Sequence, residues 1–465
     1  MSFLTHPRTL PLLVAGAFFM EFLDGTVIAT ALPAMAQSFG VRPVDLSVGV
    51  SAYLFTLAVL LPASGWAAER FGARRVFMTA VLVFTLASVA CGFSTGLLSF
   101  TLARILQGAG GALMVPVGRL AVLRVTAKSD LMRVIAILTW PALAAPVIAP
   151  PLGGFIVTVA SWRWIFFINL PLGLLALWLA ARVVPPERGE APRRFDLAGF
   201  VLVGLALLAL LTAVELLGRE VVAWSVVAGA GAMALVLGAW ALRHIRRHPS
   251  AILRLDGFAV RSFDVSMVGG TLFRVAVGAV PFLLPLMFQI GFGLDAFRSG
   301  LLVLALFGGN VAIKPLTSAV LRRFGFKAVL IGDACLAALS ILALAGLTPV
   351  TPLPLTLLLL VIAGMTRSMG LTTINTLAFA EIAPAAMSGA NTLFNMFQQL
   401  GFGFGVALGA LALRVAELWR PEGAAHATPL EFRIALAIVS LAAVAAAVDA
   451  VRLPADAGAE VARGS

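Results

Sequence analysis

Two acidic side chains lie within the first long apolar stretch of the chain, residues 11–34. Glu21 and Asp24 are three positions apart, so a helix places both on one face. Asp24 lies about 13 residues, or roughly 20 Å, along that helix, close to the middle of a bilayer. Burial in apolar surroundings favours the neutral form of a carboxyl group. We therefore predict that this pair takes up and releases protons. The alternative is that neighbouring bases hold both acids ionised in salt bridges.

Five basic residues also fall within apolar stretches: Arg104, Arg119, Arg274, Lys314 and Arg367. Arg119 and Lys314 are close enough to one face of the membrane for the alternative that they merely snorkel. Arg274 and Arg367 are about mid-span, so we expect them to face an aqueous cavity or an acid. All of these bases but Arg104, together with Asn310, form the predicted substrate cavity.

Charge counting within the stretches gives an expectation about the substrate. Five bases stand against three acids, because Asp333 is added to the pair in the first stretch. A cavity with surplus positive charge favours anionic or zwitterionic substrates over lipophilic cations.

The elements that must position these residues are membrane helices. Of the 465 residues, 61% are apolar and 12% charged, and the mean hydropathy is +1.04. Soluble domains are about 45–50% apolar and 25% charged, and disordered chains are more polar still, so both classes are excluded. An all-α integral membrane protein is predicted. Its fourteen expected spans are 11–34, 47–68, 76–93, 97–121, 134–158, 164–183, 197–216, 222–242, 263–289, 299–321, 328–347, 353–380, 388–413 and 430–451.

The distribution of basic residues predicts the orientation of these spans. With the N-terminus inside, the inner loops and tails hold 21 Lys and Arg and the outer loops hold 7. Basic residues concentrate in cytoplasmic loops, so both termini are predicted to be cytoplasmic. This rule accounts for the net charge of +12 without nucleic acid as a partner. A cleavable signal peptide is the alternative for the first stretch, but that stretch is too long and contains two acids.

A short sequence recurs after corresponding spans. Arg70-Phe71-Gly72 and Arg323-Phe324-Gly325 are each followed by one residue and a base, at an offset of 253 residues. Parallel repeats of this kind are typical of transporters. We therefore predict a six-helix bundle over 1–183, linkers and an inserted helix pair over 184–261, and a second six-helix bundle with a tail over 262–465.

The loop after the second span carries the first copy of this repeat. Its acid and bases are predicted to form an ionic latch on the cytoplasmic side. The alternative is that the bases only set topology. Gly72 is expected to permit a tight turn. The residues of this predicted latch are Gly65, Glu69, Arg70, Gly72, Arg74 and Arg75.

The fifth span is rich in proline and glycine. Prolines remove backbone donors and kink a helix, and glycines allow close helix approach. A hinge-like seam between the two bundles is predicted here, with ordinary helix packing as the alternative. The residues of this predicted seam are Pro146, Pro150, Pro151, Gly153 and Gly154.

Some kinds of site receive no support from the sequence. The histidines His6, His244, His248 and His426 lie in loops or just outside spans, and we found no metal-ligand pattern among them. No Walker A sequence occurs. We therefore expect no metal site, no cofactor and no ATP-driven chemistry.

Several segments together resemble the fourteen-helix drug:proton antiporter family of the major facilitator superfamily. The first-helix signature is matched by 22–28 and 31–33, and the cytoplasmic loop motif by 65–75, with Glu69 and Ala73 departing from it. Residues 104–110 match the fourth-helix motif. Residues 145–154 resemble the antiporter motif with alanines at two glycine positions, and 161–164 and 167–173 resemble the entry to the sixth helix.

This resemblance implies the major facilitator fold and a proton-coupled antiporter that exports small organic molecules, as multidrug or metabolite efflux. It implies that Arg104 takes part in proton transfer with the first helix. The expected partners are a small-molecule substrate, protons and the lipid bilayer. The expected form is a monomer in the bacterial cytoplasmic membrane. Export of organic anions, such as carboxylates or their metal chelates, is a second reading. An intramembrane transferase is a remote third, because the histidines are poorly placed for catalysis.

Overall fold

The computed structural model describes residues 9–126, 130–185, 195–217, 222–248, 251–417, 428–459 and 461. Within these ranges the chain is helical and contains no strand. Thirteen helices are long and apolar enough to cross a membrane, and the shorter apolar helix Ala296–Ala312 lies in the place of one further predicted span. The prediction of an all-α membrane fold is therefore confirmed.

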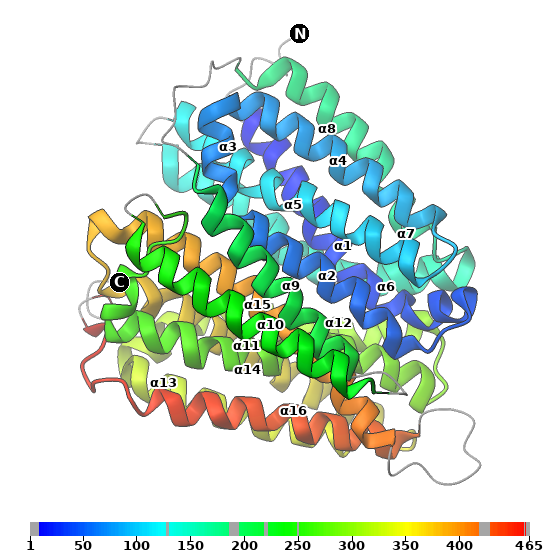
Figure 1. Ribbon diagram of the computed structural model, residues 1–465. Coiled ribbons are helices and arrows are strands. Elements are labelled where there is room, and N and C mark those ends of the chain that lie inside the picture. Colours follow the sequence, from blue (N-terminus) through cyan, green and yellow to red (C-terminus); the bar gives the residue numbers. More distant parts are fainter. Residues whose placement is uncertain are drawn as a thin grey trace.

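The N-terminal half forms one bundle, drawn in blue to cyan in Figure 1. Its core pairs are α1 with α6, α4 with α5, and α2 with α5. The helices are α1 (Thr9–Phe39), α2 (Ser47–Leu60), α3 (Ala63–Phe71), α4 (Ala73–Phe93), α5 (Leu97–Val125), α6 (Leu131–Val159), α7 (Trp164–Phe167) and α8 (Asn169–Val183).

The C-terminal half forms the second bundle, drawn in yellow-green to red in Figure 1. Helix α11 packs on α15 and α16, and α12 packs on α14. The helices are α11 (Arg261–Leu286), α12 (Ala296–Ala312), α13 (Lys314–Ala345), α14 (Leu353–Ala380), α15 (Met387–Glu417) and α16 (Pro429–Ala450). Short turns of 3-10 or π-helix cover Pro43–Leu46, Asp256–Ala259, Met287–Gly291 and Pro384–Ala386.

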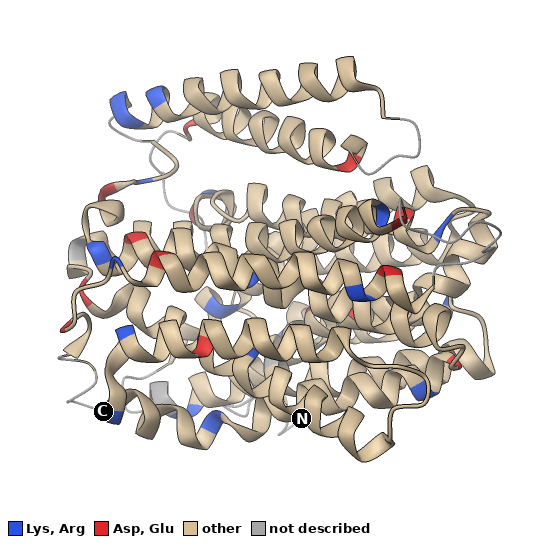
Figure 2. Cartoon of the chain, turned by 90° about the horizontal axis from the view of Figure 1, so that it is seen from below, with Lys and Arg blue, Asp and Glu red and all other residues tan. Residues whose placement is uncertain are grey.

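The inserted pair consists of α9 (Leu197–Leu217) and α10 (Trp224–Arg247). The two helices pack on each other, and α9 also contacts α2 of the first bundle and α15 of the second. The pair thus lies along the junction of the two bundles (Figure 1). Charged residues gather mostly toward the ends of the helices and leave long uncharged stretches between them (Figure 2), as a bilayer requires.

Two predicted spans are each broken into two helices in the structure. The expected span 47–68 is interrupted between α2 and α3, next to Pro62, and the expected span 299–321 is interrupted between α12 and α13, next to Pro315. Proline has no backbone N–H to continue the hydrogen-bond ladder, which explains both breaks. The two prolines are 253 residues apart.

The same offset relates unusual backbone positions in the two halves. Gly40 and Gly293 have φ angles of 66° and 70°, and Gly72 and Gly325 have φ angles of 85° and 76°. Positive φ is open to glycine and costly for other residues, which explains why glycine occupies both members of each pair. The repeat seen in one short loop motif therefore extends to the backbone conformation of both bundles.

Candidate functional site: a cavity between the two bundles

A cavity of about 1400 Å³ lies between the two bundles. We call the end at which α1 begins and α16 ends the inner end, and the opposite end the outer end. The cavity reaches the inner end, where Glu69, Asp196 and Met387 line it. From there it extends along α1, α2 and α5 on one side and α11 to α15 on the other.

Asp24 lies outside this cavity in a fully buried polar cluster. Its Oδ2 accepts a hydrogen bond of 2.6 Å from the guanidinium of Arg104, and both side chains are 0% exposed. Its Oδ1 accepts hydrogen bonds from the amides of Gln107, at 2.8 Å, and Asn169, at 3.0 Å. The guanidinium also lies over the ring of Tyr53, with 4.0 Å between its carbon and the ring centroid. Helices α1, α2, α5 and α8 meet here. For Asp24, this geometry shows the salt bridge to a neighbouring base that the alternative reading describes.

Glu21 lies one turn earlier on α1 and has a different environment. It lines the cavity with 8% of its surface exposed. Its Oε2 atom is buried and has no hydrogen-bond partner among the described residues. On α5, Gly111 leaves room beside it, because a Cβ atom there would lie 3.5 Å from that oxygen. The two acids that the sequence pairs are therefore separated, one into a buried polar cluster and one onto the cavity wall.

Four of the five residues predicted to line the cavity do so: Arg119, Asn310, Lys314 and Arg367. The Nζ atom of Lys314 donates a hydrogen bond of 2.7 Å to the hydroxyl of Thr372. The guanidinium of Arg367 lies 5.4 Å from the ring centroid of Phe307.

The prediction for Arg274 is wrong, because this residue is not part of the described lining of the cavity. It is 0% exposed, with one nitrogen 3.4 Å from the carbonyl oxygen of Ser266 and its guanidinium carbon 4.8 Å from the ring centroid of Phe394. The mid-span position indicated burial correctly, but not the face of α11 on which the side chain lies.

Over the whole cavity, the described lining holds three acids, Glu21, Glu69 and Asp196, and three bases, Arg119, Lys314 and Arg367. Of the five bases counted within the spans, Arg104 and Arg274 are buried in the bundles instead. The part of the lining that comes from the spans keeps a surplus of three bases over one acid, and the two acids of the inner end offset it. What remains is an asymmetry, since Lys314 and Arg367 come from the C-terminal half and none of the described C-terminal lining residues is an acid.

A row of amide side chains on the C-terminal wall was not predicted from the sequence. Asn391, Asn395 and Gln398 lie on α15 at spacings of four and three, and all three line the cavity. This spacing places them on one helix face. An amphipathic pattern inside an apolar span was therefore visible in the sequence. Neighbouring polar residues that line the same wall are Ser368, Thr372, Asn375, Ser388, Thr392 and Gln399.

The predicted latch at the inner end is not formed. Within the described part of the chain, Glu69 makes no ion pair with Arg70, Arg74 or Arg75, and it lines the cavity with Gly65. Arg74 instead donates a hydrogen bond to the carbonyl oxygen of Ala181 on α8. Arg70 and Arg75 are exposed, and Gly72 makes the positive-φ turn that the sequence predicts.

Ion pairs join the two bundles at the outer end instead. Arg42 pairs with Glu417 at 3.3 Å and with Asp45 at 3.1 Å, and Arg414 also pairs with Asp45. The first base and the first acid after α1, Arg42 and Asp45, thus meet Glu417 and Arg414 at the end of α15. We call these four residues the outer latch. None of the four belongs to the cavity lining.

The proline- and glycine-rich part of α6 lies against the other bundle, as the predicted seam requires. A Cβ atom on Gly154 would lie 2.3 Å from the carbonyl oxygen of Ala296, at the start of α12. In turn, a Cβ atom on Gly300 of α12 would lie 2.3 Å from the carbonyl oxygen of Pro150 and 3.1 Å from the Cα atom of Pro151. The two backbones therefore touch where glycines permit it.

Two other residues of the seam have different neighbours. Gly153 faces α1 within its own bundle, where a Cβ atom would lie 2.6 Å from the hydroxyl of Thr30. Pro146 lines the cavity, as does Pro150. The seam therefore connects the interbundle contact with both α1 and the cavity wall.

The sequence of this chain is similar to those of known proteins. Residues 14–406 match the family model described as "Major Facilitator Superfamily". A protein of Escherichia fergusonii named "Putative multidrug resistance protein MdtD" is 38% identical over 409 residues, which is 86% of this chain and 85% of that protein. The protein of the same name from Citrobacter koseri is 35% identical over 443 residues, or 92% and 91% of the two chains.

Solved structures resemble the fold at low sequence identity. A D-xylose-proton symporter has a TM-score of 0.69 at 17% identity, over 97% of this chain and 98% of that one. The transporter PepTSo of the POT family has a TM-score of 0.67 at 14% identity, over 96% and 98%.

Proposed function

Because the chain belongs to the major facilitator superfamily, a family of transporters and not of enzymes, we propose that it is a proton-driven antiporter that exports small organic molecules. Multidrug resistance in the name of its relatives supports efflux of organic compounds. In this proposal the inner end is cytoplasmic and the membrane is the bacterial cytoplasmic membrane, as the excess of basic residues in the inner loops favours. The transporter acts as a monomer, and the proton gradient drives it without a cofactor.

The observation that carries the proposal is the position of Glu21. Its carboxyl group lines the cavity, and one of its oxygens has no hydrogen-bond partner among the described residues. A carboxyl group at this depth is costly when ionised and uncompensated, so it has reason to bind a proton. It also has access to the water or substrate in the cavity, which Asp24 lacks.

The proposed cycle follows from this difference. Protonated Glu21 is neutral and tolerates a closed, dry cavity, whereas ionised Glu21 requires water or a substrate group beside it. Proton uptake on one side and release on the other then bias the two bundles between their two arrangements, as alternating access requires. The Asp24–Arg104 cluster, one turn away on α1, keeps its charges fixed and holds this helix in position.

Transport in proteoliposomes with an imposed pH gradient tests the proposal. The assay measures uptake of a fluorescent drug such as ethidium into inside-out oriented vesicles. We expect Glu21→Gln to abolish the dependence of uptake on the pH gradient while binding of the drug remains. Asp333→Asn is the matched control, because Asp333 is another buried acid within a helix but does not line the cavity. Full pH-driven transport by Glu21→Gln contradicts the proposal.

A second candidate substrate class is favoured by the C-terminal wall. Lys314 and Arg367 line it together with the amides of α15, and its described residues include no acid. Such a wall binds carboxylates by charge-assisted hydrogen bonds. Competition between quaternary ammonium compounds and small carboxylates for binding to the purified protein distinguishes organic cations from organic anions as substrates.

A further inference from the structure

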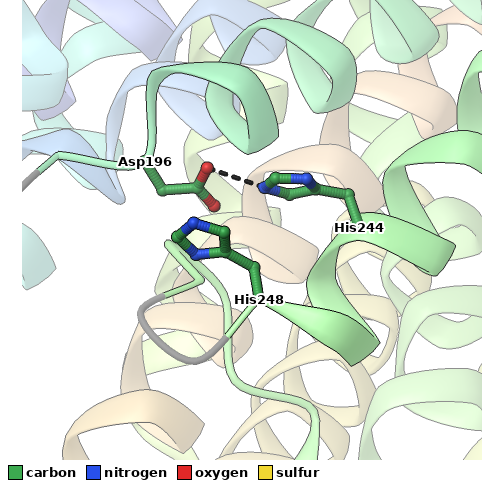
Figure 3. A group of neighbouring side chains, drawn as sticks. All are labelled: Asp196, His244 and His248. Carbon is green, nitrogen blue, oxygen red and sulfur yellow. Dashed lines mark hydrogen bonds and ion pairs between the residues drawn. The ribbon is translucent and has the colours of Figure 1, made fainter.

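Three residues at the inner end lie close together although they are far apart in the sequence. Asp196 immediately precedes α9, and His244 and His248 lie at the end of α10, four residues apart (Figure 3). Their candidate ligand atoms all lie within 4.8 Å of one another. The Nε2 atom of His244 is 2.8 Å from Oδ1 of Asp196. The two imidazole rings are stacked, with 4.9 Å between centroids and 20° between planes.

The carboxylate of this cluster is held firmly. The side chain of Asp196 is 2% exposed. Its Oδ1 accepts a hydrogen bond of 2.9 Å from the backbone N–H of Gly199, and its Oδ2 accepts one of 3.1 Å from the N–H of Ile252. Burial raises the pKa of Asp196, but the hydrogen bonds from Gly199, His244 and Ile252 outweigh it, so the pKa lies below its ordinary value. A carboxylate that two backbone N–H groups hold in a fixed orientation therefore lies beside two imidazoles.

The histidines are placed where one ion can reach both. Residues four apart on a helix lie on the same face, and the helical hydrogen bond from the N–H of His248 to the carbonyl oxygen of His244, at 2.8 Å, keeps them in that register. Bonds of about 2.0–2.1 Å around a tetrahedral Zn²⁺ separate ligand atoms by about 3.3 Å. The candidate ligand atoms of the cluster, all within 4.8 Å of one another, are close to this spacing. The arginines of the same turns, Arg243, Arg246 and Arg247, have exposed side chains that extend into solvent.

We propose that Asp196, His244 and His248 form a binding site for a divalent transition-metal ion. Two imidazoles and one carboxylate with an open fourth position are a ligand set suited to Zn²⁺. The bound ion would fasten the start of α9 to the end of α10. Because the N–H of Ile252 donates a hydrogen bond to Asp196, the ion would also hold the segment that leads to α11 in place. Asp196 and Ile252 line the cavity at its inner end, so the site adjoins the path of the substrate.

Metal titration of the purified full-length protein tests this site. The protein carries a purification tag without histidine and is first depleted of metal with a chelator, and Zn²⁺ binding is then measured against a chromophoric competitor. We expect one high-affinity Zn²⁺ per chain, with Mg²⁺ failing to compete. His244→Ala and His248→Ala should each weaken binding by at least about tenfold. Co²⁺ in place of Zn²⁺ should give the visible absorption of a tetrahedral site.

Two further variants keep the test decisive. His426→Ala removes a histidine that lies outside the described residues and in a different part of the sequence, and it should bind Zn²⁺ like the unaltered protein. Asp196→Asn should also weaken binding, but it removes an anchor of α9, so its melting temperature without metal is measured alongside. Equal Zn²⁺ affinity in the unaltered protein and the His244→Ala/His248→Ala double variant overturns the proposal. The same is true if the unaltered protein binds no Zn²⁺.

Discussion

The two bundles share one backbone plan, yet they treat buried charge in opposite ways. In the N-terminal bundle, Asp24 and Arg104 form a buried ion pair, and the amides of Gln107 and Asn169 donate further hydrogen bonds to Asp24. In the C-terminal bundle, Lys314 and Arg367 line the cavity without an acid among the described residues of their wall. The repeat offset even places Arg274 in the position that corresponds to Glu21. The two halves therefore share one arrangement of helices, whereas their side chains differ: the N-terminal half pairs its buried acid and base, and the C-terminal half presents to the cavity bases that have no acid partner among the described residues.

Breaking the ion pair of the N-terminal bundle should have the largest effect. Asp24→Asn leaves the guanidinium of Arg104 buried without its counter-ion, which costs about 3–5 kcal/mol. We expect a large loss of folded protein and of melting temperature in detergent. Neutralising both partners, as Asp24→Asn with Arg104→Gln, should recover part of the loss. If Asp24→Asn is as stable as the unaltered protein, the ion pair does not stabilise the N-terminal bundle.

Adding a side chain where the backbones of the two bundles touch should have the next largest effect. Gly154→Ala places a methyl group 2.3 Å from the carbonyl oxygen of Ala296. Overpacking of this kind costs about 1–3 kcal/mol, so we expect a lower melting temperature and impaired transport. Gly16→Ala is the control, since a Cβ atom there has nothing within 4 Å. If Gly154→Ala keeps the melting temperature and transport rate of the unaltered protein, the two backbones can move apart here without loss of stability.

Removing charge from the C-terminal wall should change ligand binding and leave folding intact. If carboxylates are the substrates, Lys314→Met and Arg367→Met each lose a charge-assisted contact, and we expect about tenfold weaker carboxylate binding, equivalent to about 1.4 kcal/mol. Binding competition and melting temperature are measured together. Arg75→Met, at an exposed base outside the cavity, is the control. Stronger binding of organic cations to these variants would instead assign cations as substrates.

Weakening the outer latch should have the smallest effect. The side chains of Arg42 and Glu417 are 31% and 22% exposed. Such pairs contribute about 0.2–1 kcal/mol, so Arg42→Ala should reduce the equilibrium constant for closure at the outer end by about 1.4-fold to fivefold. Spin labels at Ser161 and Thr348, in outer loops of the two bundles, report this equilibrium through their distance. Arg298→Ala is the control, because its partner Asp295 lies in the same bundle.

Most of the fold was predictable because it follows from local properties. Apolar length predicts each span, and Gly72 in the repeated loop motif predicts a tight turn. The interruptions at Pro62 and Pro315 were nevertheless missed, because hydropathy continues across them. The row formed by Asn391, Asn395 and Gln398 was also visible as a periodic pattern, although the sequence analysis did not use it. Arg274 could not have been assigned, since its depth in the membrane says nothing about the face on which it lies.

The sequence by itself determined that the chain spans a membrane, how its two halves repeat, and which titratable groups must be buried. These follow from the number and order of residues, because apolar length and charge placement act locally along the chain. Only the tertiary structure decided how those groups are divided. It separates Glu21 from Asp24, forms the latch at the outer end, and joins Asp196 with the histidines of α10. Each of these outcomes depends on the distance between helices that are remote in sequence, and that distance is set by the packing of all of them together.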